Sequence, residues 1–181
     1  MKHSPDGAPH LGGHANITHT DEGALEYLES LGYTSLWDIG CGPGAQTRLA
    51  IQRGWRAMGI DGDPRIQTEH TLLHDFTKGK PQCDPRDVAW STEFLEHVEE
   101  QYQANYMAVF QQCKIAVVTY APPGAKGHHH VNCRTEGYWK LKFKKYGFEY
   151  SPKHTEAIRQ ASTMTRDFVR ETGLVFLNAN T

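Results

Sequence analysis

Apolar residues recur along this chain with two spacings, one typical of helices and one typical of short buried strands. Ala24, Tyr27, Leu28 and Leu31 fall at i, i+3, i+4 and i+7, so they would share one face of a helix that ends at Gly32. Further helices are expected at residues 45–53, 98–113 and 136–146, and a late helix at the Ser151-Pro152 pair.

Short apolar runs separate these helices, and we expect them to form strands at residues 35–39, 56–60, 71–74, 87–91, 115–120 and 174–177. Strands that alternate with helices are joined by crossover connections, which produce a mostly parallel sheet with helices on both faces. In such a doubly wound α/β sheet, ligands bind outside the carboxyl ends of the strands. The residues that directly follow each strand are therefore the candidates for function.

Length, charge and hydropathy narrow the class of protein. The 181 residues are expected to form a single domain, residues 1–181, in which residues 1–19, rich in Gly, His and Pro, form a leader arm. The net charge of −2 at pH 7 argues against general binding to DNA. No apolar run approaches the ~18 residues of a membrane helix, and the N-terminus lacks a signal-peptide pattern. We expect a soluble cytoplasmic protein, and four cysteines without a C-x-x-C pair fit reduced thiols.

A glycine-rich turn follows the first expected strand. Residues 38–44 read DIGCGPG, in which Asp38 precedes the turn and Gly40 and Gly42 let the backbone approach a ligand closely. Asp61 follows the second strand, 21 positions after Gly40, near the offset at which a carboxylate accepts hydrogen bonds from ribose hydroxyls. The G-x-G-x-G spacing differs from the G-x-G-x-x-G of dinucleotide folds, which favours a ligand without a phosphate group.

Residues 37–44 (WDIGCGPG) and the acidic Asp61 resemble two motifs of the class I S-adenosylmethionine-dependent methyltransferases, and the likeness extends through most of the chain. The resemblance implies a Rossmann-like, doubly wound fold with seven strands. Residues 148–150 and 174–177 would form its reversed C-terminal hairpin. It also implies S-adenosyl-L-methionine as the cofactor and methyl transfer as the reaction.

The resemblance further assigns residues to the cofactor. Asp75 and Phe76, after the third strand, would frame the adenine, and the segment that starts with Ser91, after the fourth strand, would line the methionine moiety. The leader would close over the cofactor, with His14 or His19 at the methionine carboxylate. The alternative for Asp75 is a helix cap, and the alternative for the leader is a capped helix start preceded by loose histidines.

Three further segments look like a bacterial and phage subgroup of small methyltransferases that is associated with sugar or secondary-metabolite modification. They are residues 93–98 (EFLEHV), 121–124 (APPG) and 130–132 (HVN), the last followed by Tyr138-Trp139. This likeness supports the reaction better than it supports any particular acceptor.

Glu93, Glu96 and His97 are spaced three and four apart, so on a helix they would share one face, which His130 could approach. Two carboxylates and two imidazoles suit Mg²⁺, Mn²⁺ or Zn²⁺. The pattern is similar to the metal site of small-RNA 2′-O-methyltransferases and ubiquinone-biosynthesis O-methyltransferases, where the metal would lower the pKa of the acceptor hydroxyl. In the alternative interpretation no metal is bound, the glutamate is a cap, and the histidine faces solvent or substrate.

Three consecutive histidines, His128, His129 and His130, lie in a region expected to be a loop. We expect His130, part of the HVN segment, to face the acceptor as a base or a ligand, and the other two to be bystanders. The alternative is a polar loop without a role. A zinc site of His128, His130 and Cys133 would lack a fourth ligand.

These expectations combine into an S-adenosylmethionine-dependent methyltransferase that acts on a small acceptor. A hydroxyl is the expected nucleophile, and His97 and His130 are the candidate catalytic bases. Residues 91–94 (STEF) differ from the Asn/Asp-Pro-Pro-Tyr segment of DNA amino-methyltransferases. Three alternatives stay open: a binding protein of the same fold that transfers no methyl group, a metal-assisted RNA 2′-O-methyltransferase, and a nicotinamide-dependent oxidoreductase.

Overall fold

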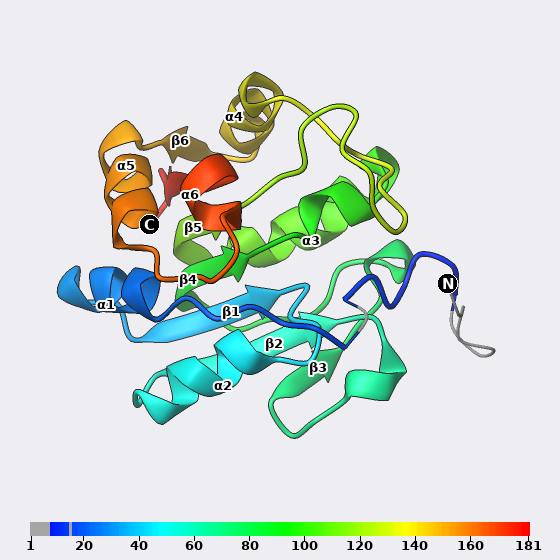
Figure 1. Cartoon of the computed structure of the whole chain (residues 1–181), viewed down its shortest axis with the longest axis horizontal. Helices are drawn as coiled ribbons and strands as arrows, with labels where there is room; N and C mark the ends of the chain where they lie inside the picture. Colours follow the sequence, from blue (N-terminus) through cyan, green and yellow to red (C-terminus); the bar gives the residue numbers. More distant parts are fainter. Residues whose placement is uncertain (1–7, 15) are drawn as a thin grey trace.

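A computed structural model describes residues 8–14 and 16–181 of the chain. Its centre is a seven-stranded sheet with the order β3-β2-β1-β4-β5-β7-β6 (Figure 1). The strands are β1 (Ser35–Ile39), β2 (Arg56–Asp61), β3 (Thr71–Leu73), β4 (Arg86–Ser91), β5 (Cys113–Val118), β6 (Phe148–Tyr150) and β7 (Leu174–Asn178). Strands β1 to β5 pair in parallel, whereas β7 is antiparallel to both β5 and β6. The expected mostly parallel, Rossmann-like sheet with a reversed C-terminal hairpin is confirmed.

Helices cover both faces of the sheet. They are α1 (Glu22–Ser30), α2 (Ala45–Gln52), α3 (Gln103–Phe110), α4 (Glu136–Lys145), α5 (Pro152–Ala161) and α6 (Phe168–Thr172). Buried residues of α1, α2, α5 and α6 form one core with the sheet, and those of α3 and α4 form a second core. Neighbouring strand residues such as Leu36 and Trp37 enter different cores, because successive side chains of a strand point to opposite faces. Every helix of the described residues is too short or too polar to cross a membrane.

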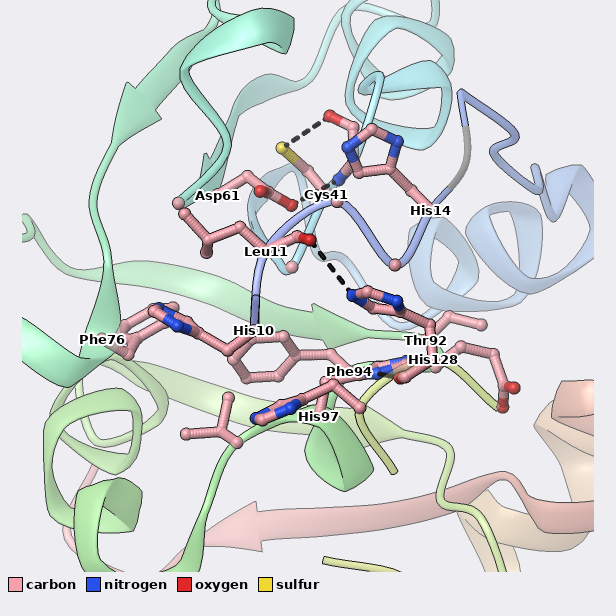
Figure 2. A pocket seen from close by; sticks show the side chains of 18 of the residues that line it. His10, Leu11, His14, Cys41, Asp61, Phe76, Thr92, Phe94, His97 and His128 are labelled. Atoms are coloured by element: carbon pink, nitrogen blue, oxygen red, sulfur yellow. Dashed lines mark hydrogen bonds between the residues drawn. The ribbon is translucent and has the colours of Figure 1, made fainter. Parts of the chain in front are cut away.

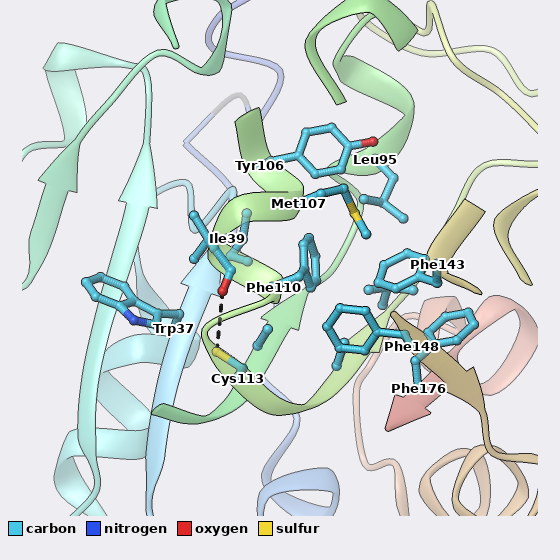
Figure 3. Close-up of a cluster of buried hydrophobic side chains, with 14 of the residues drawn as sticks. Trp37, Ile39, Leu95, Tyr106, Met107, Phe110, Cys113, Phe143, Phe148 and Phe176 are labelled. Carbon is cyan, nitrogen blue, oxygen red and sulfur yellow. Dashed lines mark hydrogen bonds between the residues drawn. The ribbon is translucent and has the colours of Figure 1, made fainter. Parts of the chain in front are cut away.

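The core between α3, α4 and the sheet is built largely from aromatic rings (Figure 3). Phe143 of α4 stacks on Phe176 of β7 with ring centroids 4.2 Å apart, and it meets Phe110 of α3 edge-on at 5.2 Å. All three side chains are fully buried. Because burial of such a side chain stabilises a fold by about 1.5–3 kcal/mol, these rings hold α3 and α4 on the sheet.

The helix limits follow local signals in the sequence. Asp21 caps α1 by accepting a hydrogen bond from the Ala24 amide at 3.1 Å, and Ser151 caps α5 by accepting one from the His154 amide at 3.3 Å. Gly32 has a φ of 85° just after α1, a conformation that favours glycine. The expected starts and ends of these helices therefore have direct physical causes.

The long helix expected at residues 98–113 is wrong at both ends. Helix α3 covers only the middle of this range, and two 3₁₀ turns, η3 (Leu95–His97) and η4 (Glu100–Tyr102), precede it. Val98 has an extended backbone (φ −111°, ψ 123°), and Cys113 begins β5, where it pairs with Arg86 of β4. The apolar residues have a helical spacing in the sequence although they belong to separate elements, which pack them into one core. The pattern also does not predict α6, which is too short to show a period.

Candidate active site

A cavity of about 720 Å³ opens at the carboxyl ends of the strands (Figure 2). The first residues after β1, β2, β3 and β4 all line it, namely Gly40, Gly62, His74 and Thr92. A doubly wound topology predicts a ligand site at this position. The volume lies within the range of about 300–1,000 Å³ that is typical of small-molecule sites.

The glycine turn after β1 forms one wall of the cavity. Its Gly40 has a φ of 74°, and a Cβ atom there would lie 2.3 Å from the ring of Phe94, so a larger residue does not fit. The Gly40 amide donates to the Ile60 carbonyl at 2.8 Å, which ties the turn to β2. At Gly42 a Cβ atom would lie 3.1 Å from that of His14, so the leader approaches the turn closely.

Two aspartates, the buried Asp38 and the half-buried Asp61, lie next to this turn. Asp38 is the last residue but one of β1 and lines the cavity, and its carboxylate accepts a hydrogen bond from the Thr47 hydroxyl at 2.8 Å. Burial raises the pKa of Asp38 to about 7, although the hydrogen bonds with Thr47 oppose this shift. Asp61 accepts from the amides of Gly42 and Asp63, each at 2.9 Å, and burial raises its pKa as well. Both carboxylates line the cavity, one at the end of each of two neighbouring strands.

Asp75 and Phe76 lie together at the β3 side of the cavity. Asp75 caps the 3₁₀ turn η2 (Phe76–Lys78) by accepting from Thr77, and it also lines the cavity, so a capping role and a binding role are compatible. Burial raises the pKa of this carboxyl, but hydrogen bonds from Thr77 and His10 outweigh burial and hold the pKa below its usual value. The Phe76 ring meets the Phe94 ring edge-on at 5.5 Å.

The leader lines the cavity, with His10, Leu11 and His14 beside it (Figure 2). His10 Nε2 lies 3.1 Å from the Asp75 carboxylate, and His14 Nε2 lies 3.1 Å from the Asp63 carboxylate. Between them, the Leu11 carbonyl accepts a hydrogen bond from His128 Nε2 at 3.2 Å. These three contacts attach the leader to the segments after β2, β3 and β5.

His14 and His19, the two histidines expected near a cofactor carboxylate, both line the cavity. His14 is engaged by Asp63, as described above, and the His19 ring packs edge-on against Phe168 at 5.2 Å. Burial and the charge of Arg166 lower the pKa of His19. The leader's first seven residues, with His3 among them, lie outside the described residues.

Ser91 differs from the other expected cofactor residues because it does not line the cavity. Its side chain is fully buried, and its hydroxyl donates to the Ile39 carbonyl at 3.0 Å, which joins β4 to β1. The next two residues, Thr92 and Glu93, line the cavity instead.

Glu96, His97 and His130 form a cluster beside this site. One possible ligand atom from each lies within 4.8 Å of the other two. The expectation that Glu93, Glu96 and His97 share a helical face is wrong, because η3 is a single 3₁₀ turn and Glu93 precedes it with a φ of 52°. Thr119 holds that left-handed residue, since its hydroxyl accepts from the Glu93 amide at 2.8 Å. A turn and a distant loop therefore bring the cluster together.

The cluster has an unusual electrostatic arrangement. Both carboxylate oxygens of Glu96 are buried and have no hydrogen-bond partner in the described chain. Burial and the neighbouring Glu93 raise the pKa of Glu96 to about 8, and burial together with His130 lowers the pKa of His97 to about 4. The Nδ1 atoms of His97 and His130 face the carbonyls of His128 and Ala125, at 2.8 and 3.2 Å. Since carbonyls only accept, each Nδ1 carries the proton and each Nε2 keeps a free electron pair.

The alternative zinc site of His128, His130 and Cys133 is not assembled. His128 uses its Nε2 for the leader, and Cys133 Sγ lies 3.6 Å from the protonated Nδ1 of His130. Among the described residues, Glu96, His97 and His130 are the one group of such side chains whose ligand atoms lie close enough together to hold a metal ion, and neither His128 nor Cys133 belongs to it.

Arg166 and Phe168 line the cavity without any signal in the sequence. Arg166 lies just before α6 and Phe168 begins it, so both are far along the chain from the motifs that indicate the site. The connection from β6 to β7 brings them close to the carboxyl ends of the other strands. No local sequence pattern predicts this long-range contact.

Neither a family model nor a curated protein matches this sequence. Solved structures do match. A TehB-like S-adenosylmethionine-dependent methyltransferase from Corynebacterium glutamicum has a TM-score of 0.61 at 15% identity, over 86% of this chain and 87% of that chain. The 1,6-didemethyltoxoflavin-N1-methyltransferase of Burkholderia thailandensis, crystallised with S-adenosylhomocysteine, has 0.59 at 12%, over 86% and 76%.

A third solved structure, the small RNA methyltransferase HEN1, has a TM-score of 0.54 at 14% identity, over 71% of this chain and 22% of that chain. At such low identities the likeness concerns the fold. All three proteins are methyltransferases, and two of them are named for different substrates, a small RNA and 1,6-didemethyltoxoflavin. This chain therefore has the fold of the class I S-adenosylmethionine-dependent methyltransferases.

Proposed function

We propose that this protein transfers the sulfonium methyl group of S-adenosyl-L-methionine to a hydroxyl group of a small acceptor. The observation that carries the proposal is the content of one cavity. Its lining includes the glycine turn, the carboxylates of Asp61 and Asp75, and the imidazoles of His97 and His130. A nucleoside cofactor and a hydroxyl acceptor need these two sets of groups next to each other.

The carboxylates and the glycine turn support binding of the cofactor. Each oxygen of Asp61 accepts one backbone hydrogen bond and keeps a further electron pair for a ribose hydroxyl. Asp75 and Phe76 would frame the adenine, and Asp38 would accept a hydrogen bond from the amino group of the methionine moiety. The proposed cofactor-binding residues are Asp38, Gly40, Gly42, Asp61, Asp75 and Phe76, and Ser91 supports them by fixing the end of β4.

The transfer itself is a single in-line displacement. An electron pair of the acceptor oxygen forms the new bond to the methyl carbon while the carbon–sulfur bond breaks, and its electron pair stays on the sulfur. The hydroxyl proton passes to a free Nε2 of His97 or His130. Since the low pKa of His97 keeps it neutral at pH 7, it can accept a hydrogen bond from the hydroxyl. Placing the oxygen in line with the methyl group can supply about 7–11 kcal/mol of the barrier reduction.

A small acceptor is favoured over a nucleic acid by the charge of the site. Within the described chain, Arg166 is the only Lys or Arg that lines the cavity, whereas nucleic-acid recognition depends on several contacts to phosphates. The leader also forms part of the cavity wall, held there by His10 and His14, which leaves less room for a polymer. The Burkholderia structure illustrates that this fold can act on a small molecule.

One observation favours a metal-assisted form of the reaction. The unpartnered, buried carboxylate of Glu96 is costly on its own, and a divalent cation would satisfy it. Glu96, His97 and His130 would hold the cation, because the Nδ1 contacts leave both Nε2 electron pairs free for it. When bound, such a cation lowers the pKa of an acceptor hydroxyl and orients it. An RNA 2′-hydroxyl is the alternative acceptor for this form.

A methyl-transfer assay tests the proposed function. The protein is incubated with S-adenosylmethionine labelled in its methyl group and with phenols, catechols, sugars or short RNA, and S-adenosylhomocysteine formation is measured. We expect product with a hydroxylated small molecule, and a rate about 10²- to 10⁴-fold lower for the His97→Ala/His130→Ala double variant than for the exposed control His70→Ala. Product with RNA alone would support the RNA alternative. No product despite cofactor binding would support a non-catalytic binding protein.

Calorimetry with Mn²⁺ and Zn²⁺ tests the metal-assisted form separately. We expect binding to the wild type and about 10- to 100-fold weaker binding to Glu96→Gln and His130→Ala. The His70→Ala variant is the matched control. Equal binding to all four proteins, or none to the wild type, would leave His97 and His130 as metal-free bases.

A further inference from the structure

The cavity contains one strongly basic side chain that the proposed function does not use. Arg166 belongs to the segment between α5 and α6 and lies exposed at the rim of the cavity. In the part of the chain that the structure describes, it is the sole Lys or Arg of the lining. The same lining contains five carboxylates, those of Asp38, Asp61, Asp75, Glu93 and Glu99.

Arg166 has no carboxylate partner of its own. Throughout residues 8–14 and 16–181, its guanidinium makes neither an ion pair nor a hydrogen bond, and its contact is with the ring of Phe168, 5.3 Å from Cζ. By contrast, Arg53, Arg65 and Arg170 each pair with a carboxylate. Arg166 is therefore available to bind an anion inside the cavity.

The strand order places Arg166 at one end of the cavity. Asp75 follows β3 at the edge of the sheet, Asp61 ends β2, and Asp38 and Glu93 lie at the ends of β1 and β4. A nucleoside cofactor with its adenine at β3 and its ribose at β2 would therefore extend toward β1 and β4. Arg166 lies at that far end, because its guanidinium packs on Phe168, whose ring meets the ring of His19. Its charge also acts on Glu93, just after β4.

We infer that Arg166 binds the carboxylate of the cofactor's methionine moiety. The inference rests on the proposed function and adds to it a residue that no motif of the sequence indicates. S-adenosylmethionine carries one carboxylate, and the described lining offers one permanent positive charge. A guanidinium can hold a carboxylate with two parallel hydrogen bonds.

The two histidines expected at this carboxylate are less suited to it. His14 is already paired with the Asp63 carboxylate at 3.1 Å. His19 is kept neutral by burial and by the nearby Arg166, which together lower its pKa. The Phe168 ring contacts the His19 ring and also the guanidinium of Arg166. It therefore positions the guanidinium at the rim of the cavity.

Calorimetry with two ligands tests this assignment. S-adenosylhomocysteine carries the amino-acid carboxylate, whereas 5′-methylthioadenosine shares the adenosine and the thioether but lacks the amino-acid part. We expect Arg166→Gln to weaken S-adenosylhomocysteine binding about 10- to 100-fold and to change 5′-methylthioadenosine binding less than about twofold. Arg166→Lys, which keeps the charge, should give an intermediate loss.

Arg170→Gln is the matched control. Arg170 lies four residues further along, pairs with Asp167, and does not line the cavity, so both affinities should stay unchanged. Unchanged S-adenosylhomocysteine binding in Arg166→Gln would overturn the inference, and so would an equal loss for both ligands, which would indicate a structural role. If the wild type binds neither ligand, the proposed function itself fails and the inference fails with it.

Discussion

His10 Nε2 lies 3.1 Å from the carboxylate of Asp75, although 65 positions separate the two residues along the chain. The same carboxylate caps η2 through the Thr77 amide at 2.9 Å. Asp75 therefore connects the leader to the end of β3, at the point where we propose that the adenine binds. The leader and the proposed cofactor site are parts of one hydrogen-bonded unit.

Loss of the His10 imidazole should loosen this unit. We expect His10→Ala to raise the dissociation rate of S-adenosylhomocysteine about 3- to 10-fold, because a partly exposed hydrogen bond contributes about 0.5–1.5 kcal/mol. Stopped-flow displacement measures the rate. His70→Ala removes a partly exposed imidazole just before β3, at the end of the strand opposite to Asp75 and outside the cavity lining, and should leave the rate unchanged. Equal rates in the two variants would argue against a covering role for the leader.

The close approach of Phe94 to Gly40 predicts the effect of a single methyl group. Gly40→Ala would place its Cβ 2.3 Å from the Phe94 ring, so either the turn or the ring must move and cofactor affinity should fall at least about tenfold. Gly32→Ala is the control, because its φ of 85° is equally strained but nothing lies within 4 Å of the added atom. It should cost only about 1–2 kcal/mol of stability. Equal cofactor binding by the two variants would contradict the prediction that the contact between Gly40 and Phe94 excludes a larger residue.

Asp38 predicts a dependence of stability on pH. Its folded pKa of about 7 is above the value of 3.8 for an unfolded chain, so the folded protein binds an extra proton between these values. The contribution of Asp38 to the free energy of unfolding should therefore be largest below about pH 4 and decrease as the pH rises toward 7, by at most about 1.4 kcal/mol per pH unit. Asp38→Asn removes the titration and should flatten that decrease. Urea unfolding at several pH values measures the free energy of unfolding. The same dependence on pH in the wild type and in Asp38→Asn would contradict the prediction.

The stacked pair of Phe143 and Phe176 predicts a large loss of stability. Phe143→Ala should lower the free energy of unfolding by about 3–5 kcal/mol, because the ring is fully buried among other rings. Leu141→Ala on the same helix is the control, since Leu141 is 72% exposed and should change stability by less than about 0.5 kcal/mol. Denaturant unfolding compares the two, and similar losses would mean that α4 does not pack as described.

Short elements with sharp local limits could be predicted from the sequence. Strand β1 has the expected bounds, since its apolar run lies between a polar turn and the glycine turn, and β6 also has its expected bounds. The limits of helix α3 could not be predicted, because Val98 and Cys113 keep a helical spacing while they belong to an extended segment and to β5. Tertiary packing overrides the local period there.

Some residues of the candidate site could likewise be predicted from the sequence, and others could not. The carboxylates of Asp38, Asp61 and Asp75 could be located because each lies at or just after a strand end, and strand ends meet at one edge of the sheet. Ser91 could not be separated from Thr92, since the direction of a side chain at a strand end depends on the exact register. Arg166 carries no local signal at all, because it reaches the cavity only through the return of the chain to β7.

Calorimetric titration with S-adenosylmethionine, S-adenosylhomocysteine and NAD tests the central claim most directly. The wild type should bind the first two and not NAD, and Asp61→Ala should weaken both by about 10- to 100-fold, because a charge-assisted hydrogen bond to the ribose is lost. Asp84→Ala removes a carboxylate that lies outside the cavity and should bind as the wild type does. Binding of NAD without binding of either adenosyl compound would contradict the account and assign the glycine turn to a different chemistry.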